Sequence, residues 1–240
     1  MKILTPYSEI NFGVQAKMKH LYCISGLGAD ERIFSKLEVP DTDIHHIKWL
    51  SPGELSESIE VYADRIAQQI VHSNSIILGV SFGGMMAIEV AKRIPVSAVI
   101  LLSSIKSRNE LPGWMKGCGL LKLNALIPNR PISSIRPLKM IRPLENYFLG
   151  TESPEEKRIA DDFRDNVDPK YLKWSLTQVL NWKNSWIPPV IYHIHGEKDR
   201  IFPIGKVRPT HTIPKAGHFM IMNRYKEINE ILLSICSDIE

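Results

Sequence analysis

One short segment of the chain joins a strand pattern to a helix pattern through a glycine–serine–glycine turn. Residues 75–80 read S-I-I-L-G-V, a nearly unbroken apolar run that is typical of a strand buried on both faces. Residues 82–93 are rich in Met and Ala, and Pro95 ends the helix that they predict. Between the two, residues 79–83 read G-V-S-F-G and match the pattern G-x-S-x-G. The segment predicts a strand, a tight turn with Ser81 at its tip, and a helix.

The turn at Ser81 has specific physical requirements. Its serine must adopt a strained backbone conformation so that the hydroxyl projects from the end of the strand. The neighbouring residues must lack side chains that would collide with the turn, which accounts for glycine at positions 79 and 83. The following helix directs its free N–H groups and the positive end of its dipole at the site. These features make Ser81 a candidate nucleophile.

Short apolar runs alternate with helical patterns over much of the chain. We expect strands at residues 21–24, 44–50, 75–80, 96–102, 190–195 and 208–213, and helices at 29–37, 56–72, 82–93 and 219–235. This alternation predicts an α/β fold with a mostly parallel central sheet flanked by helices. It stops between about residues 104 and 188, where helices are predicted to begin at Ser153 and Asp168. We interpret residues 1–240 as a single domain that carries a helical insertion at about 104–188.

The composition argues against several classes of protein. The formal net charge is +4, the basic residues are scattered, and no zinc-finger or phosphate-loop pattern occurs, so no nucleic-acid partner is expected. The three cysteines are too widely spaced for a disulfide framework. No apolar run is long enough to cross a bilayer, and the first twenty residues do not read as a signal peptide. We therefore expect a cytoplasmic monomer or homodimer without a membrane partner.

A serine hydroxyl is a weak nucleophile and needs a base that is itself held by an acid. Four histidines follow Ser81 in the sequence. His193 and His195 lie within a predicted strand and share one of its faces, and His211 lies in the weak last strand. His218 alone lies in a turn, between the last strand and the last helix. It is the predicted base.

The loop that follows the strand at 190–195 supplies the candidate acids. It contains Glu197 and Asp199, and carboxylates in this loop would emerge at the same edge of the sheet as Ser81. The loop after the strand at 96–102 has no carboxylate before Glu110. We predict Asp199 as the acid, with Glu197 as the alternative.

The segments at 79–84 (G-V-S-F-G-G), 195–203 (H-G-E-K-D-R-I-F-P) and 217–219 (G-H-F) resemble motifs of the α/β-hydrolase superfamily and occur in its order. The resemblance covers the chain from Leu21 onward. It implies a helical cap inserted after the strand at 96–102, which follows the helix that begins after Ser81. It also implies an oxyanion hole of two backbone N–H groups, here those of Leu27 and Phe82. Ser25 stands where many members have histidine, so the support of that hole is expected to differ.

The resemblance implies acyl transfer to water by a carboxylesterase-like or thioesterase-like enzyme. Ser81 would attack the carbonyl carbon of a small ester or thioester, form an acyl-serine, and be restored by water that His218 activates. No metal and no organic cofactor are expected. The tryptophans of the insertion favour an apolar acyl group. The alternatives are a lyase, a C–C bond hydrolase or an acyltransferase with the same three residues, and a ligand-binding receptor without catalysis.

Overall fold

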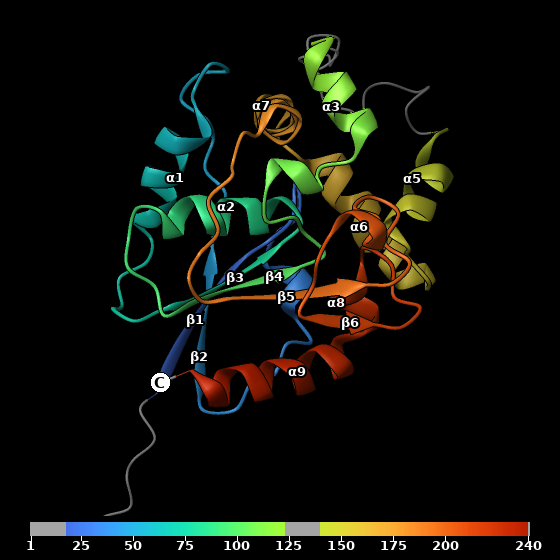
Figure 1. The fold of residues 1–240 in the computed structure, drawn as a ribbon. Coiled ribbons are helices and arrows are strands. Elements are labelled where there is room, and N and C mark those ends of the chain that lie inside the picture. Colours follow the sequence, from blue (N-terminus) through green and yellow to red (C-terminus); the bar gives the residue numbers. More distant parts are fainter. Residues whose placement is uncertain (1–17, 123–139, 240) are drawn as a thin grey trace, which may run out of the picture.

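A single parallel sheet forms the centre of the molecule (Figure 1). The computed structural model describes residues 18–122 and 140–239. Its six strands lie in the order β2-β1-β3-β4-β5-β6, and every neighbouring pair is parallel. Their bounds are β1 Lys19–Ile24, β2 Thr42–Ile47, β3 Ile76–Val80, β4 Ala98–Leu102, β5 Ile191–Gly196 and β6 His211–Ile213. The predicted strands and the predicted α/β class are confirmed.

Helices cover both faces of the sheet (Figure 1). On one face, α1 (Ile59–Ala67) and α2 (Phe82–Ala91) pack against apolar side chains that include Ile77 and Leu101. On the other face, α9 (Tyr225–Asp238) packs against side chains that include Leu78 and Ile100. Strands β3 and β4 are buried along their whole length, since both of their faces are covered.

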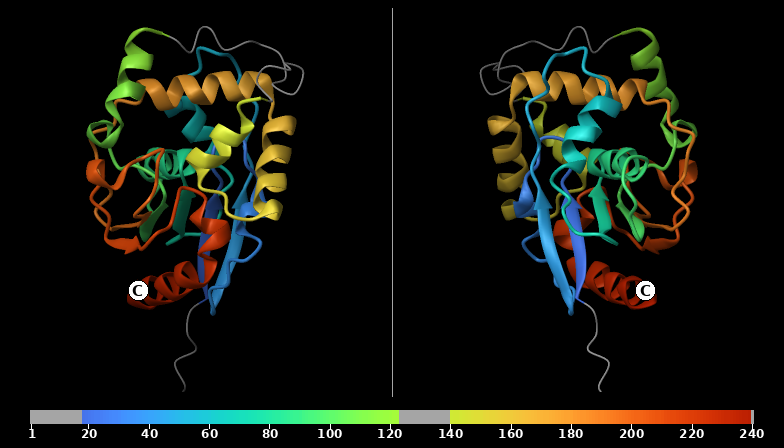
Figure 2. Two further views of the ribbon diagram at one scale, coloured as in Figure 1. Left: turned by 90° about the vertical axis from the view of Figure 1, so that its right-hand side faces the viewer. Right: turned by 90° about the vertical axis from the view of Figure 1, so that its left-hand side faces the viewer.

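Four helices connect β4 to β5 within the described residues. They are α3 (Gly113–Leu120), α5 (Arg142–Leu149), α6 (Pro154–Asn166) and α7 (Pro169–Asn181). The two side views show α7 crossing over the end of the sheet opposite to α9 (Figure 2). This is the end at which the strands finish, because Tyr171 of α7 contacts Trp49, which follows β2. Residues 123–139 of the predicted insertion lie outside the described residues.

The predicted start of α6 at Ser153 is confirmed. The Ser153 hydroxyl accepts a hydrogen bond from the backbone N–H of Glu156 at 3.1 Å, and the Glu156 carboxylate accepts one from the N–H of Glu152 at 2.8 Å. This reciprocal arrangement satisfies backbone donors that have no partner inside the helix. Asp168 caps α7 in a similar way through the N–H of Lys170.

Two predicted helices take a different form. Residues 29–37 contain a single 3-10 turn, η1 (Glu31–Phe34), and further 3-10 turns occur at Arg108–Glu110 (η2) and Ile204–Lys206 (η5). The predicted closing helix is two helices, α8 (Met220–Asn223) and α9, because Arg224 leaves the helical conformation between them. The Arg224 guanidinium binds the Glu152 carboxylate at 2.6 Å. The break between α8 and α9 thus coincides with an ion pair between residues distant in sequence. No glycine or proline at this point of the sequence indicates that the helix ends there.

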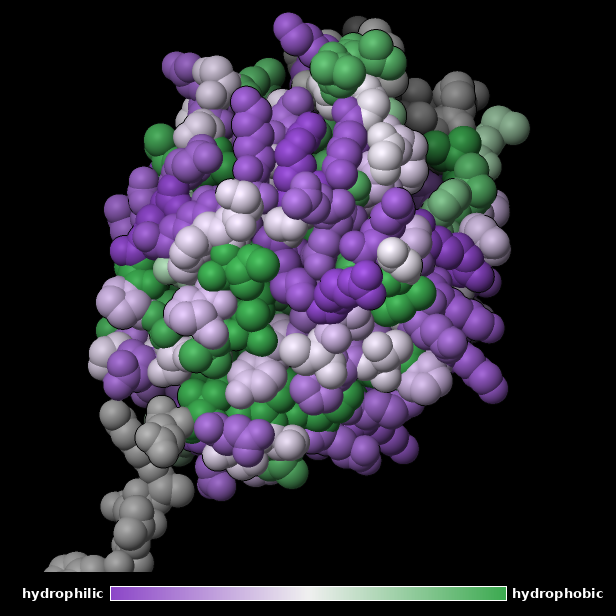
Figure 3. All heavy atoms as spheres, in the orientation of Figure 1, coloured by the Kyte–Doolittle hydropathy of each residue, from purple (hydrophilic) through white to green (hydrophobic). Residues whose placement is uncertain are grey.

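The surface seen in Figure 3 mixes hydrophilic side chains with smaller hydrophobic groups. Among the described residues, no helix combines the length and apolar character needed to cross a membrane.

Candidate active site

Ser81 lies between the end of β3 and the start of α2, at the edge of the sheet where the strands finish. Its backbone has φ 54° and ψ −118°, a conformation that L-residues rarely adopt. Such strain persists only where the surrounding structure enforces it, and it clusters at functional sites. The sequence pattern around Ser81 predicts this strained turn, and the structure shows it.

Glycines at positions 79 and 83 are required by close packing of the backbone. A Cβ at Gly79 would lie 2.3 Å from the carbonyl oxygen of Gly83, and a Cβ at Gly83 would lie 2.3 Å from the carbonyl oxygen of Ile24. Both distances are far below a van der Waals contact. The turn can therefore form, and pack against β1, only when both positions lack a side chain.

Ser104, which follows β4, supports the same turn. Its hydroxyl donates a 2.6 Å hydrogen bond to the backbone carbonyl of Ser81. The neighbouring Ser103 also has a positive φ, of 47°. Ser104 is not among the site residues predicted from the sequence, in which the loop after β4 matters only as an alternative position for the acid. Two adjacent serines directly after a buried strand are the sequence signal that could indicate this role.

The turn that carries His218 is held from two sides. The backbone N–H of Phe219 donates to the carbonyl of Leu149, the last residue of α5, at 2.8 Å. The N–H of Lys198 donates to the carbonyl of Ala216 at 2.8 Å, which joins this turn to the loop after β5. His218 is buried and is placed by these bonds over the end of the sheet.

Ser81, His218 and Asp199 form one connected chain of hydrogen bonds. His218 Nε2 lies 2.9 Å from Ser81 Oγ, and His218 Nδ1 lies 2.7 Å from Asp199 Oδ2. An ionised carboxylate only accepts hydrogen bonds, so His218 Nδ1 must carry the proton. The lone pair of Nε2 then faces the serine hydroxyl, which donates to it. This is the arrangement that a general base requires.

Several interactions act on the ionisation of Asp199. Burial raises the pKa of its carboxyl, but the charge of His218 and the hydrogen bond from its ring lower it, and the net pKa lies below the usual value. The other oxygen, Oδ1, accepts hydrogen bonds from the N–H groups of Ile201 and Phe202 at 2.8 and 2.9 Å. Asp199 is thus ionised at neutral pH and fixed in orientation.

Glu197, the alternative acid, lies elsewhere. Its carboxylate accepts a hydrogen bond from the backbone N–H of Lys215 at 2.9 Å. It therefore stabilises the turn before His218 and does not contact the imidazole. His211 lies in β6 and is hydrogen-bonded to Thr210. The structure brings together Ser81, Asp199 and His218 from the candidates.

His193 and His195 form a buried polar chain behind Asp199. Both side chains are fully buried in β5. His195 Nε2 lies 2.8 Å from the carbonyl oxygen of Phe202, so it must be the donor, and His195 Nδ1 accepts from His193 Nε2 at 3.1 Å. His195 Nε2 also lies 3.5 Å from Asp199 Oδ2. The alternation of residues in the strand predicted a shared face, but not these partners.

Burial of these two imidazoles should make the protein sensitive to acid. Burial, followed by the charges of His195 and Lys106, lowers the pKa of His193 to about 3, and burial also lowers the pKa of His195. Because the folded-state pKa is below the unfolded value of about 6.5, the unfolded chain binds the extra proton, and stability falls as the pH drops from about 6.5 toward 3. His193 alone should lower the free energy of unfolding by about 2 kcal/mol between pH 7 and pH 5.

Urea unfolding at several pH values checks this expectation. The slope of the unfolding free energy against pH reports the number of protons that are taken up on unfolding. In His193→Gln this number should decrease by about one. His211→Gln, at a partly exposed histidine, is the matched control for the loss of an imidazole. Equal slopes in the wild type and His193→Gln would contradict the expectation. The lowered pKa of Asp199 acts in the same direction, but it begins only below about pH 5.

The two predicted oxyanion donors lie on segments that pass beside Ser81. Phe82 is the first residue of α2, and Leu27 lies in the loop after β1. A Cβ built on Gly26 would lie 3.6 Å from the Cβ of Ser81, so this loop runs directly along the serine. Among the described residues, neither Leu27 nor Phe82 donates its N–H in a hydrogen bond.

Ser25 organises the loop at the position where histidine was expected from the resemblance. Its hydroxyl donates to the carbonyl of Ala29 at 2.7 Å and accepts from the indole N–H of Trp49 at 2.9 Å. Ser25 is buried, and the Trp49 ring stacks on Phe82 with 5.3 Å between ring centroids. A hydrogen-bonded serine–tryptophan pair therefore supports the loop, in place of the histidine side chain that many members of the superfamily have at this position.

A cleft of about 230 Å³ opens next to this loop. It lies between the loops after β1 and β2 and the helices α6 and α7. Apolar and polar side chains both line it, and its residues are Gly28, Ala29, Asp30, Arg32, Trp49, Leu50, Ser51, Phe163, Asn166, Val167, Asp168 and Tyr171. Ser81 and His218 are not among them. The cleft begins at Gly28, next to the predicted donor Leu27.

Comparison with known proteins identifies the family. Residues 22–231 match the family described as "Alpha/beta hydrolase family", so this chain belongs to the α/β-hydrolase family. Membership in this family supports a hydrolytic activity. A comparison with curated proteins finds no match.

Solved structures with the same fold include several hydrolases. An esterase from Thermogutta terrifontis has a TM-score of 0.66 and 13% identity, with 92% of this chain and 90% of that chain covered. An N-acyl homoserine lactonase has a TM-score of 0.67 and 17% identity, covering 94% and 90%. An epoxide hydrolase from Bacillus megaterium has a TM-score of 0.63 and 14% identity, covering 91% and 93%. At these identities the likeness shows the fold alone.

Proposed function

We propose that this protein is a serine hydrolase that cleaves a small ester or thioester through an acyl-serine intermediate. The observation that carries the proposal is the hydrogen-bonded chain from Ser81 Oγ through the His218 imidazole to the Asp199 carboxylate. A base within hydrogen-bond reach of a hydroxyl, itself oriented by a third group, is the geometric signature of an activated nucleophile.

The first half of the reaction forms the acyl-serine. Ser81 Oγ bonds to the carbonyl carbon of the substrate while its proton passes to His218 Nε2. The carbonyl electron pair moves onto oxygen, and the N–H groups of Leu27 and Phe82 stabilise the negative charge. When the carbonyl re-forms, the bond to the leaving oxygen or sulfur breaks, and His218 returns the proton to that atom. The alcohol or thiol departs.

The second half repeats these steps with water. Water gives a proton to His218 Nε2 and its oxygen bonds to the acyl carbon. Collapse of the resulting oxyanion breaks the bond to Ser81 Oγ, which takes the proton back from His218. A carboxylic acid leaves and the enzyme is restored. The ionised Asp199 stabilises the imidazolium in both halves, without accepting its proton.

The cleft beside Leu27 supports a small, partly apolar substrate. Trp49, Phe163 and Tyr171 provide aromatic surface on its walls. Its volume of about 230 Å³ is below the range of roughly 300–1,000 Å³ that is usual for sites of drug-sized ligands. We propose that it receives a short acyl group. Two structural neighbours are described as an esterase and a lactonase, and a lactone is a cyclic ester.

A panel of p-nitrophenyl esters and matching acyl thioesters tests the proposal. Turnover of acetyl and butyryl substrates is expected, with a decline for longer chains that exceed the cleft. Val167→Phe should narrow the cleft, because Val167 packs against Gly28, and should raise KM for butyrate more than for acetate. Val71→Phe, at an exposed valine near the other end of the sheet, is the matched control. Absence of turnover for every ester and thioester, in a protein shown to be folded, would refute the proposal.

A further inference from the structure

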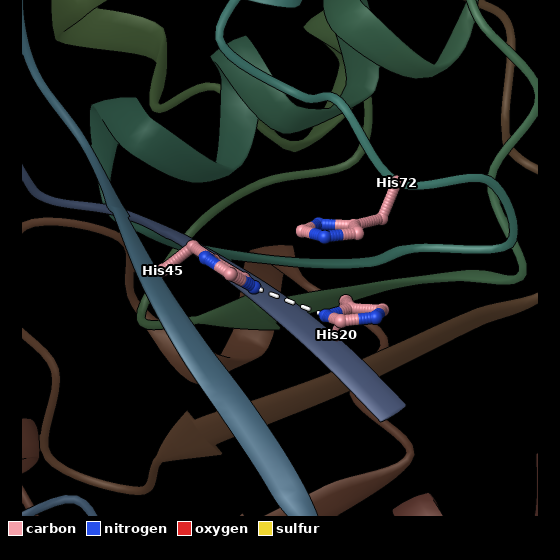
Figure 4. Close-up of side chains that lie close together, drawn as sticks. All are labelled: His20, His45 and His72. Atoms are coloured by element: carbon pink, nitrogen blue, oxygen red, sulfur yellow. Dashed lines mark hydrogen bonds between the residues drawn. The ribbon is translucent and has the colours of Figure 1, made fainter. Parts of the chain in front are cut away.

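Three histidines converge near the end of the sheet opposite to Ser81, where the strands begin. His20 is the second residue of β1, His45 lies in β2, and His72 lies in the turn that precedes β3 (Figure 4). One ring nitrogen from each lies within 4.8 Å of those of the other two. Intervals of 25 and 27 residues separate them, which match no metal-binding motif, so the sequence alone gives no signal of the cluster.

The strand register explains why two of the imidazoles meet. In the β1–β2 pair, His20 lies opposite Asp43, and Tyr22 lies opposite His45. Residues two apart in a strand share a face, so these four side chains gather on one side of the sheet. His46, the neighbour of His45, points to the other face, where its ring lies 5.7 Å from that of Phe34.

Three donor atoms already have the spacing of ligands around one ion. His20 Nδ1 lies 3.1 Å from His45 Nε2, and Asp43 Oδ2 lies 3.2 Å from His45 Nε2 and 3.7 Å from His20 Nδ1. Ligands placed tetrahedrally at the usual zinc–nitrogen distance of about 2.05 Å are separated by about 3.4 Å. The carboxylate also supplies negative charge beside the two imidazoles.

The outer shell is arranged to present His72 as a further ligand. The Tyr22 hydroxyl lies 2.7 Å from His72 Nδ1 and accepts a hydrogen bond from the N–H of Val71 at 3.1 Å. When Nδ1 donates this bond to the Tyr22 oxygen, the ring is fixed and Nε2 keeps a lone pair for a metal. The His72 ring stacks on that of His20 with 3.6 Å between centroids, so it must tilt to direct Nε2 at the same ion.

We propose that His20, His45 and His72, with Asp43, bind one Zn²⁺ ion. Imidazole nitrogens with one carboxylate oxygen are a donor set that suits zinc and disfavours magnesium and calcium. The histidines are half-buried and Asp43 is exposed, so the ion has access from solvent. The nearest lysine in sequence, Lys19, is turned away, since its ammonium binds the carbonyls of Cys236 and Ile239 near the end of α9.

The role of this ion would be structural. β2 is the edge strand of the sheet, and it contacts only β1 among the strands. An ion held by His45 and Asp43 of β2, His20 of β1 and His72 of the turn before β3 would cross-link three segments. Binding to the folded protein alone raises its stability with zinc concentration. The hydrogen shared by His20 Nδ1 and His45 Nε2 would move to the other nitrogen of its ring when the ion binds.

Isothermal titration calorimetry with Zn²⁺ tests the proposal. It uses the full-length protein without an affinity tag, after a chelator has removed any bound metal. The wild type should bind one ion and show a Tm that rises with zinc. His45→Gln and His72→Gln, which keep a polar side chain, should each weaken binding at least tenfold and remove the rise in Tm. His46→Gln is the matched control on β2 and should behave as the wild type does.

Two results would overturn the proposal. One is an absence of saturable zinc binding to the folded wild-type protein. The other is equal binding by the wild type, His45→Gln and His72→Gln. Far-UV circular dichroism of each variant without zinc shows that it is folded. Co²⁺ in place of Zn²⁺ adds a readout that a purely structural change would not produce, because a four-coordinate site gives an intense visible absorption that should disappear in His72→Gln.

Discussion

Replacement of Ser81 by alanine is expected to abolish ester hydrolysis while leaving the protein folded. The loss in kcat should be on the order of 10⁵- to 10⁶-fold, because Ser81 alone among the described residues has a hydroxyl hydrogen-bonded to His218 Nε2. Alanine also lacks the hydroxyl without adding bulk to the turn. The thermal unfolding midpoint should therefore stay close to that of the wild type.

A fluorophosphonate probe measures the same nucleophile directly. Mass mapping of the labelled wild type should place the probe on Ser81, and Ser81→Ala should remain unlabelled. Ser97→Ala is the matched control, because Ser97 precedes β4 at the other end of the sheet and its hydroxyl donates to the carbonyl of Asn74. Full labelling of Ser81→Ala, or a folded wild type that neither takes the probe nor cleaves esters, would contradict the assignment.

The centre of the sheet could be predicted from the sequence because β3 and β4 are buried on both faces. Such strands must be apolar at successive positions, as in residues 75–80, and the structure places β3 at Ile76–Val80. The strained turn at Ser81 could also be predicted from the sequence. Its two glycines are required by backbone contacts inside the turn and between the turn and β1. Burial and close backbone packing leave a strong local pattern.

Features that depend on partners distant in sequence could be predicted only where the chemistry required a partner. The hydrogen bond from Ser104 to the Ser81 carbonyl spans 23 positions, and the contact between His218 and Ser81 spans 137. The chemistry of the serine still pointed to His218, because a nucleophile needs a base. Nothing comparable demanded Ser104, the break at Arg224 or the cluster around His20. A functional requirement can thus locate a distant residue, whereas a purely structural contact leaves no such trace.

Replacement of Asp199 by asparagine is expected to lower kcat by about 10,000-fold, because it changes which ring nitrogen of His218 carries the proton. Asp199 Oδ1 accepts hydrogen bonds from the N–H groups of Ile201 and Phe202. In Asp199→Asn the amide oxygen must take this place, so the amide nitrogen faces His218. Because that nitrogen donates, His218 Nδ1 has to accept, and the imidazole proton moves to Nε2. An N–H then faces Ser81 Oγ and cannot remove its proton.

Glu197→Gln is a close control for this effect, since it makes the same chemical change two residues away. The Glu197 carboxylate only accepts a hydrogen bond from the Lys215 N–H, which an amide oxygen can also do, so activity should stay near that of the wild type. Steady-state kinetics and thermal unfolding of both variants separate lost catalysis from lost structure. If Asp199→Asn kept more than about a tenth of the activity, the tautomer of His218 would not depend on Asp199, and the role of this carboxylate would be limited to holding the loop.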